Sequence, residues 1–376
     1  MHLDWSILPR PIIALSPMAD MTDSAFCRTV RSLCHPDDQR EEGSPHLEIP
    51  RRFTPRDDRG LNREDKKRKL ILFREMVSAE AVVRGNDKTL TMTDIHEDER
   101  PLVQQLFGSN PATMAEAVRI LEEAHHPEGF DVNMGCPVYK IVNNFNGAAL
   151  MREPELATKI IRAMKAATRL PVSIKIRAGW DNPRECIEFS KVVEAAGADL
   201  ITMHGRTKTQ GYSGESDWNL IGEVKRGLSI PLLANGDIHT PPLTLKALDT
   251  TGADGVLIAR GALGNPWIFS QIENLLDGRE PKAVTLEERV RVVKHHLAYH
   301  MEQYGERGIV TFRKHLSWYF RGVSGAKPYK ERLHTATNKD QVDAILDEML
   351  LHGLMDGLST RDALHPQATE RVFMKK

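Results

Sequence analysis

The sequence has few cysteines, and neither sign of charge predominates in it. Its four cysteines, Cys27, Cys34, Cys136 and Cys186, form no CxxC pair and lack the spacing of metal ligands. Their number and spacing suit a reducing compartment better than a disulfide framework, so we predict a cytoplasmic protein. The 51 lysines and arginines are balanced by 52 acidic residues, which excludes a strong overall basic field. Any contact with nucleic acid must therefore depend on local basic patches.

Long apolar runs and several familiar motifs are also absent. No run approaches the about 20 apolar residues that span a bilayer, and the amino-terminal apolar patch is too interrupted for a signal peptide. We therefore expect no membrane association, and we expect a monomer. The ends of the predicted strands carry neither Gly-x-Ser-x-Gly nor a group of acids and histidines with metal-ligand spacing. These absences argue against a serine hydrolase and against metal-assisted hydrolysis, and we predict no bound metal.

Short apolar runs alternate with amphipathic stretches from residue 11 to about residue 265, which is typical of parallel βα units. The predicted strands are Ile12–Leu15, Leu70–Phe73 (extending toward Val77), Leu102–Phe107, Phe130–Asn133, Val172–Ile176, Leu200–Met203, Ile230–Ala234 and Gly255–Ile258. The clearest helices between them are Ala112–Ala124, Pro154–Ala167, Glu185–Ala196 and Thr240–Thr250. Eight such strands over about 250 residues favour a (β/α)8 TIM barrel. A doubly wound open sheet is the alternative, but no Gly-x-Gly-x-x-Gly follows the first strand.

Two segments depart from this alternation. Residues 35–69 contain ten basic and nine acidic residues, four prolines and few large apolar side chains. This composition predicts a solvated insertion, whose basic end at residues 63–69 is a candidate for contact with a phosphate backbone. Beyond residue 285, apolar residues recur at helical spacing over Leu286–Tyr304, Val310–Phe320 and Lys339–His352. We therefore predict a barrel domain over residues 1–284 and a small helical domain over residues 285–376.

The helical domain contains a basic segment with interleaved aromatic residues. Residues 307–332 hold seven lysines or arginines and one acid, together with Trp318, Tyr319, Phe320 and Tyr329. Such a mixture suits RNA, because its phosphates need neutralising and its bases stack on aromatic rings. We expect the aromatic residues to form the core of the helical domain instead, and the basic side chains to contact phosphates.

Two side chains stand out at the carboxyl ends of the predicted strands, where barrels carry their chemistry. Cys136 follows a strand and precedes Pro137, so it should lie at the rim of a pocket; an inert buried thiol is the alternative. Lys175 lies within an apolar strand and must find an anion or an acceptor, because burial of an unpaired charge is costly. The N1–C2=O edge of a flavin, which becomes negative on reduction, is such an acceptor, and an internal salt bridge is the alternative.

Other strand ends carry polar residues or glycine. Gln105, His204 and Asn235 could hydrogen-bond a flat heterocycle, although His204 could equally be a core histidine. Glycines follow the seventh and eighth strands with Arg260 beside them, and this is where barrels frequently bind a phosphate. Together these strand ends predict one binding site at the mouth of the barrel.

Seven short motifs resemble those of the tRNA-dihydrouridine synthases in order and spacing, from residue 11 to about residue 270. They are Pro17–Asp23, Gln105–Gly108, Asn133–Pro137, Lys175–Arg177, His204–Thr207, Asn235–Asp237 and Pro266–Phe269. The resemblance implies an FMN-dependent enzyme that reduces the C5–C6 double bond of a uridine in the tRNA D-loop, with NADPH or NADH as the electron donor. It also implies that the helical domain binds tRNA.

The resemblance assigns roles to individual residues. Cys136 would be the catalytic proton donor, and Asn133, Arg177 and Arg206 would lie toward the uracil or the flavin. The FMN contacts would come from Pro17, Met18, Ala19, Gln105, Lys175, His204, Asn235, Gly236, Asp237, Ala259 and Arg260. A thiol of ordinary pKa, about 8.5, is mostly protonated at neutral pH and can therefore serve as an acid.

Two other functions agree with parts of the sequence. A flavin barrel that acts on a small pyrimidine would not need the basic helical domain, and a non-catalytic tRNA-binding protein would not need the thiol and the lysine of the strand ends. The chain also departs from the family pattern at residues 143–145, where relatives often carry basic residues, and at Ala259, where glycine is frequent. These departures concern how tRNA is oriented, and hence which uridine is modified.

Overall fold

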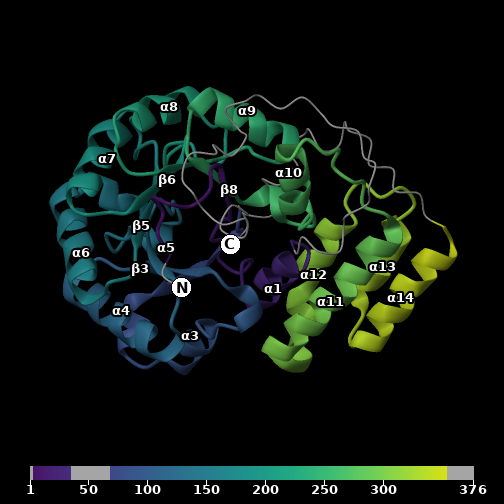
Figure 1. Cartoon of the computed structure of the whole chain (residues 1–376). Coiled ribbons are helices and arrows are strands. Elements are labelled where there is room, and N and C mark those ends of the chain that lie inside the picture. Colours follow the sequence, from purple (N-terminus) through teal and green to yellow (C-terminus); the bar gives the residue numbers. More distant parts are fainter. Residues whose placement is uncertain (1–2, 35–67, 354–376) are drawn as a thin grey trace. The chain divides into compact units, whose positions relative to one another are not determined.

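The computed structural model describes residues 3–34 and 68–353, which form two compact units (Figure 1). The first unit contains residues 3–23, 68–238 and 242–259, and the second contains residues 24–34, 239–241 and 260–353. The predicted domain boundary after residue 284 stays a prediction; by its packing, the chain from Arg260 onward clusters with the second unit. The predicted insertion at residues 35–69 lies, except for its last two residues, outside the described residues.

The first unit is a closed barrel of parallel strands in the order β1 to β8. Each strand pairs with the next, and β8 pairs with β1, with Gly255 opposite Ile12. The strands are β1 Ile12–Leu15, β2 Ile71–Ser78, β3 Leu102–Phe107, β4 Gly129–Met134, β5 Val172–Arg177, β6 Leu200–His204, β7 Leu232–Asn235 and β8 Gly255–Ile258. The predicted (β/α)8 TIM barrel is therefore confirmed.

Helices follow the strands and surround the barrel (Figure 1). They are α2 Ala79–Val83, α3 Asp87–Met92, α4 Pro111–His125, α5 Tyr139–Val142, α6 Pro154–Ala167, α7 Glu185–Ala195, α8 Trp218–Arg226 and α9 Pro241–Thr251, with 3-10 turns η3 Glu97–Glu99 and η4 Gly147–Arg152. Capping fixes where α4 begins, because the Asn110 side chain accepts from the N–H groups of Ala112 and Thr113 at 2.9 and 3.1 Å. Helix α8 has a cap of the same kind from Asp217.

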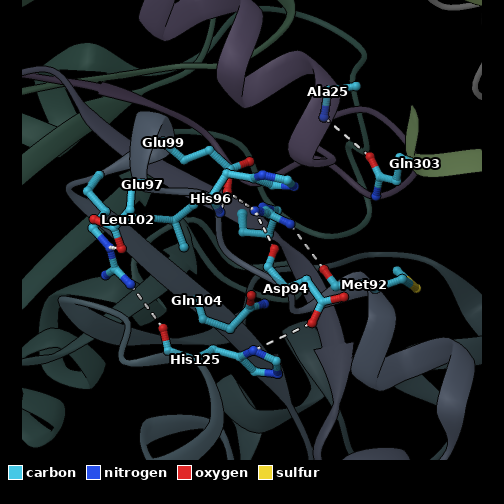
Figure 2. A network of polar contacts seen from close by, with 12 residues as sticks. Ala25, Met92, Asp94, His96, Glu97, Glu99, Leu102, Gln104, His125 and Gln303 are labelled. Carbon is cyan, nitrogen blue, oxygen red and sulfur yellow. Dashed lines mark hydrogen bonds and ion pairs between the residues drawn. The ribbon is translucent and has the colours of Figure 1, made fainter. Parts of the chain in front are cut away.

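Strand β2 follows the longer of its predicted bounds, which extended toward Val77. The apolar run ends at Phe73, but the strand continues through Arg74 and Glu75 to Ser78. Arg74 is buried on the strand because it forms an ion pair of 2.5 Å with Glu99, and both side chains are fully buried. Arg74 also donates to the carbonyl oxygens of Met92 and Asp94, both at 3.1 Å. Figure 2 labels Glu99, Met92 and Asp94 among the residues of this polar network. A buried cation with these partners can extend a strand that hydropathy alone would end.

The barrel interior changes from apolar to polar along its length. Its apolar part is built by alternate strand residues together with two residues that precede β1, and it consists of Leu3, Trp5, Ile12, Ala14, Ile71, Phe73, Val103, Leu200, Leu233 and Leu257. The rings of Trp5 and Phe73 stack with centroids 6.0 Å apart. Because Trp5 precedes the first strand, this cluster fills the amino-terminal end of the barrel. The carboxyl end is left for polar side chains.

The second unit is helical. Its elements are α1 Ser24–Ser32, η5 Arg260–Ala262, α10 Ile268–Leu276, α11 Leu286–Tyr304, η6 Gly305–Arg307, α12 Gly308–Tyr319, α13 Lys327–Thr335 and α14 Lys339–Leu351. Helix α11 packs against α1, α12 and α14. Trp318, Tyr319, Phe320 and Tyr329 are at most 9% exposed, which confirms the prediction that these aromatic residues of the basic segment form core. Among the described residues of the chain, no helix combines the length and apolar character needed to cross a membrane.

Candidate active site at the barrel mouth

Strand register brings the predicted polar residues to one end of the barrel. Asn133 of β4 lies opposite Lys175 of β5. One step closer to the mouth, Arg177, His204 and Asn235 lie side by side on β5, β6 and β7. Lys175 is also in register with residues 202 and 233, and Leu233 belongs to the barrel interior. Since side chains alternate along a strand, these five residues continue the interior-facing series.

Asn133 organises the loop that carries Cys136. Its side-chain oxygen accepts hydrogen bonds from the backbone N–H groups of Gly135 at 3.2 Å and of Cys136 at 2.9 Å. Its amide nitrogen donates to Gln105 Oε1 at 2.9 Å. Asn133 therefore fixes the backbone at the thiol, and its direct contact with a uracil or a flavin stays a prediction.

Buried hydrogen bonds deeper in the barrel hold the residues that contact Asn133. Gln105 Nε2 donates to Asp131 Oδ2 at 2.6 Å, and the Ser173 hydroxyl donates to Asp131 Oδ1 at 2.7 Å. Burial raises the pKa of the Asp131 carboxyl to about 6, although the hydrogen bonds from Ser173 and Gln105 and the charge of Lys175 each lower it. The donors hold Asp131 as an acceptor and thereby orient Gln105 toward Asn133.

Lys175 is the cation of the mouth that the sequence singles out. Its side chain is partly buried on β5. Burial lowers the pKa of its ammonium group to about 8; Arg177 lowers it further, and Asp131 acts in the opposite direction. The alternative for Lys175 was an internal salt bridge, and Asp131 is the buried carboxylate that such a bridge would need. It is shared with Gln105 and Ser173, however, so Lys175 retains donor capacity toward the mouth.

Cys136 is only partly exposed, and its thiol is a weak acid. Burial raises the pKa of this thiol. The hydrogen bond from the Val138 N–H and the positive charges of Arg177 and Lys175 act in the opposite direction and lower it. The Cys136 carbonyl accepts from Ala148 N–H at 3.0 Å. Gly147, at φ +60°, packs so closely that a Cβ there would lie 2.8 Å from the same carbonyl oxygen. The loop therefore holds a protonated thiol in one position.

Arg177 holds two loops of the mouth. It is 3% exposed, and its Nε donates to the Gly135 carbonyl at 2.8 Å. Its NH1 donates to the carbonyl oxygens of Thr207 and Gly211 at 3.0 and 2.8 Å. These contacts join the Cys136 loop to the loop after β6. They make Arg177 a positioning residue, and its predicted contact with a substrate stays a prediction.

Buried Arg206 and partly buried Asp237 form an ion pair after the ends of β6 and β7. Both terminal nitrogens of Arg206 bond to the Asp237 carboxylate at 2.8 Å, and Arg206 is 1% exposed. Arg206 NH1 also lies 3.3 Å from His204 Nε2. Asp237 accepts in addition from the Ser216 N–H at 2.8 Å. The pair therefore fixes the neighbouring imidazole and the loop after β6, and a direct contact of either residue with a ligand stays a prediction.

Position 236 has no room for a side chain. It has φ +108°, and a Cβ would lie 2.4 Å from Ser216 Oγ and 2.6 Å from His204 Cδ2. The adjacent Asn235 donates from its side chain to the Leu257 carbonyl at 2.6 Å, which ties β7 to β8. The backbone at residues 235–237 thus lies close against its neighbours, as glycines at phosphate-binding or ring-binding turns do.

The remaining predicted residues lie on the loops after β1 and β8. Pro17 and Met18 are partly buried and Ala19 is exposed. The Met18 N–H donates to Thr22 Oγ1 at 2.8 Å, which closes the first loop. Ala259 ends the first unit and Arg260 begins the second, and their predicted FMN contacts stay predictions.

Sequence reasoning missed residues on β2 that reach the same mouth. The register of β2 against β3 shifts between Arg74 and Val77, and such irregularities often occur beside active sites. Within the shift, Met76 Sδ lies 3.1 Å from Asn133 Nδ2, and Glu75 Oε2 accepts from the Asp20 N–H at 2.7 Å. Burial raises the pKa of Glu75 to about 7, and Asp23 raises it too. The signal in the sequence was the charged pair after the apolar run.

The rim beyond Cys136 exposes apolar and basic side chains together. Val138, Tyr139 and Phe145 are 51%, 74% and 59% exposed, and Lys140 beside them is exposed as well. Trp180 supports this segment, because it packs against the small cluster that contains Val142. Arg152 and Lys208 both lie over the Trp180 ring, at 5.3 and 4.3 Å from its centroid. Exposed apolar side chains with a cation beside them are typical of a binding surface.

Comparison with known proteins assigns this chain to a family. Residues 13–353 match the family model described as dihydrouridine synthase (Dus). A probable tRNA-dihydrouridine synthase 1 of Synechocystis is 38% identical over 282 residues, which cover 74% of this chain and 79% of the relative. The tRNA-dihydrouridine synthase B of Pseudomonas putida is 38% identical over 70% of this chain and 79% of its own.

A more distant relative matches over a longer stretch. The probable tRNA-dihydrouridine synthase of Mycobacterium leprae is 33% identical over 343 residues, 89% of this chain and 87% of the relative. Its match therefore extends through both units. The resemblance noted in the motifs is confirmed over the barrel and the helical unit alike: this chain belongs to the dihydrouridine synthase family.

Proposed function

We propose that this protein is a flavin-dependent oxidoreductase that reduces the C5–C6 double bond of a uridine in the D-loop of tRNA. FMN is the proposed cofactor, and NADPH or NADH is the proposed electron donor. Membership of the family supports the reaction class, since dihydrouridine differs from uridine by two added hydrogens. The observation that carries the proposal is the arrangement at Cys136, where a protonated thiol is held at the barrel mouth by Asn133 and Arg177.

The residues of the mouth fit a flavin. The absence of a side chain at Gly236 lets His204 and Ser216 pack directly against the backbone after β7, which places the His204 ring where it can contact a bound ring system. Lys175 is a partly buried cation, and it suits the N1–C2=O edge of the ring system. Gln105 and Asn133 are held by hydrogen bonds to their neighbours and present amide groups of fixed orientation. The residues after β1 and after β8 are proposed to complete the contacts.

Cys136 is proposed to supply the proton at C5. A bound flavin would supply the hydride that reaches C6, which leaves negative charge on the base. Because the pKa of Cys136 is raised, its thiol stays protonated at neutral pH and can donate to C5. The cations Lys175 and Arg177 lie close enough to influence that pKa, and they would stabilise the thiolate that remains.

The rim and the second unit are proposed to hold tRNA. The target base must leave its stack to reach a thiol at a barrel mouth. Exposed Tyr139 and Phe145 offer rings on which neighbouring bases can stack, and Lys140 offers a charge for a phosphate. In the second unit Arg307 and Lys327 are exposed, while Arg332 forms a bidentate pair with Glu348 at 2.9 and 2.7 Å. The first two are thus the better candidates for phosphate contact.

The proposal is tested with purified protein. We expect denaturation to release FMN, and we expect the protein with NADPH to convert one D-loop uridine of unmodified tRNA into dihydrouridine, seen as a mass gain of two hydrogens in that nucleotide. The same assay with free uracil or uridine separates this function from that of a small-pyrimidine reductase. Protein that is saturated with FMN but leaves tRNA unchanged while it reduces the free pyrimidine would contradict the proposal. A cytoplasmic location and a monomeric state remain predictions; the four free cysteines agree with a reducing compartment.

A further inference from the structure

Three histidines meet in the core of the second unit. His296 and His300 lie one turn apart on α11, and His315 lies on the adjacent helix α12. All three are at most 1% exposed. One ring nitrogen from each lies within 4.8 Å of those of the other two. Among the described residues, this is the one group of histidines, cysteines or acids placed so that it could hold a metal ion.

The spacing in the sequence accounts for the convergence. Residues i and i+4 of a helix lie on the same face, so His296 and His300 both point toward α12. The ring centroid of His315 is 4.6 Å from that of His296 and 5.9 Å from that of His300. His315 therefore completes a triangle of imidazoles that is built from two helices.

Hydrogen bonds orient two of the rings in the way that metal ligands require. The Thr311 hydroxyl lies 3.1 Å from the Gly308 carbonyl oxygen and 2.8 Å from His300 Nε2. When the hydroxyl donates to the carbonyl it accepts from His300, which then carries its proton on Nε2 and its lone pair on Nδ1. The Tyr319 hydroxyl lies 3.0 Å from His296 Nδ1, and as an acceptor there it leaves the His296 lone pair on Nε2. A fixed tautomer with the second ring nitrogen hydrogen-bonded is the usual state of a histidine ligand.

The walls of the cluster are apolar. The rings of Phe26 and Phe312 lie 5.4 and 4.8 Å from the His296 ring, and Trp318 lies 5.7 Å from His315. Three imidazoles in such surroundings lose their hydration, and a bound cation would compensate for that loss. Neutral imidazole nitrogens favour late first-row divalent ions, and three of them with one position for water form a common Zn²⁺ site.

We propose that His296, His300 and His315 bind one divalent transition-metal ion, Zn²⁺ in the first instance, and that the ion fastens α11 to α12. Tetrahedral coordination at about 2.05 Å would place the nitrogens about 3.4 Å apart, so the three rings would move closer together on binding. The site lies in the helical unit and takes no part in the proposed reduction. Its failure and the failure of the proposed function are therefore distinguishable.

The test uses the full-length protein after treatment with a chelator and its removal. We expect the wild type to take up one equivalent of Zn²⁺ and, with Co²⁺ as the probe, to develop the visible absorption of a tetrahedral nitrogen site. His296→Gln, His300→Gln and His315→Gln should each lose that absorption. His295→Gln should keep it, because His295 is an exposed histidine on the same helix. Circular dichroism checks that each variant is folded.

A variant outside the three ligands tests the orientation argument. Thr311→Val removes the acceptor of His300 Nε2 and leaves every proposed ligand in place, so the affinity for Zn²⁺ should fall by about 10- to 100-fold. Wild-type protein that takes up no stoichiometric Zn²⁺ would overturn the proposal. So would Co²⁺ absorption that is equal in the wild type and in a folded His315→Gln variant, because the ion would then lie elsewhere.

Discussion

Replacing Asn133 with alanine would test whether the backbone of the Cys136 loop must be held in one position. The substitution removes the acceptor of the Gly135 and Cys136 N–H groups and leaves the thiol itself untouched. It also removes the donor to Gln105 Oε1. We expect the variant still to be saturated by excess FMN, and the transfer of reducing equivalents to tRNA to slow.

The size of the effect follows from the bonds that are lost. Each of the two hydrogen bonds to the loop is worth about 1 kcal/mol net, so the loop loses about 2 kcal/mol of restraint. At about 1.4 kcal/mol per factor of ten, the rate of the step that uses the thiol should fall by about 30-fold. The lost bond to Gln105 adds about 1 kcal/mol to the loss of stability without acting on the thiol.

The assay is the anaerobic reoxidation of the bound, reduced flavin by excess tRNA, followed by its absorption. The matched control is Asn86→Ala, because Asn86 also accepts from a backbone N–H, that of Thr89 at 3.0 Å, at the start of α3. That variant should lose a similar amount of stability per hydrogen bond and react at the wild-type rate. An Asn133→Ala rate equal to that of the wild type would refute the reasoning, since the loop would then hold its position without the side chain.

Three further changes test other parts of the account. Glu99→Gln leaves the buried arginine of β2 without its ion pair and should lower the free energy of unfolding by about 3 to 5 kcal/mol in denaturant titrations, whereas Glu97→Gln, in the same turn and exposed, should change little. Glu75 has a folded-state pKa of about 7 against an ordinary value of 4.5, so between these pH values the folded state keeps a proton that the unfolded chain releases. The free energy of unfolding of the wild type, relative to that of Glu75→Gln, should therefore fall by up to about 3 kcal/mol as the pH rises from 4.5 to 7. A difference that does not change with pH would contradict the burial argument. Gly236→Ala should weaken FMN binding by about tenfold or more in fluorescence titrations, and Gly227→Ala, where the nearest atom lies 3.5 Å away and φ is negative, should leave it unchanged.

The barrel could be predicted from the sequence because each strand is a short apolar run between helical stretches. The bounds Pro154–Ala167 and Leu286–Tyr304 agree with the prediction at both ends, since a proline begins the first helix and a glycine follows the second. Helix α13 was missed because it is strongly polar and buries only Tyr329 and Leu333. Its packing against α12 and α14 supplies what its sequence pattern lacks.

The candidate site could be predicted as a set of strand ends, but its internal support could not. Asn133 and Cys136 were visible as polar residues at and after the end of an apolar run, and Lys175 as a charge inside one. The roles of Asp131 and Met76 depend on contacts between different strands, and no spacing along the chain reveals them. The histidine cluster was missed for the same reason, because a pattern search at strand ends does not examine the faces of two later helices.

The central claim is that the thiol of Cys136 supplies the proton that completes the reduction of uridine. Its most direct test is the anaerobic reoxidation of reduced flavin by tRNA in Cys136→Ala. The account predicts that this variant binds FMN as the wild type does, is reduced by NADPH, and transfers its reducing equivalents to tRNA about 100-fold or more slowly. Dihydrouridine formed by Cys136→Ala at the wild-type rate would contradict the claim.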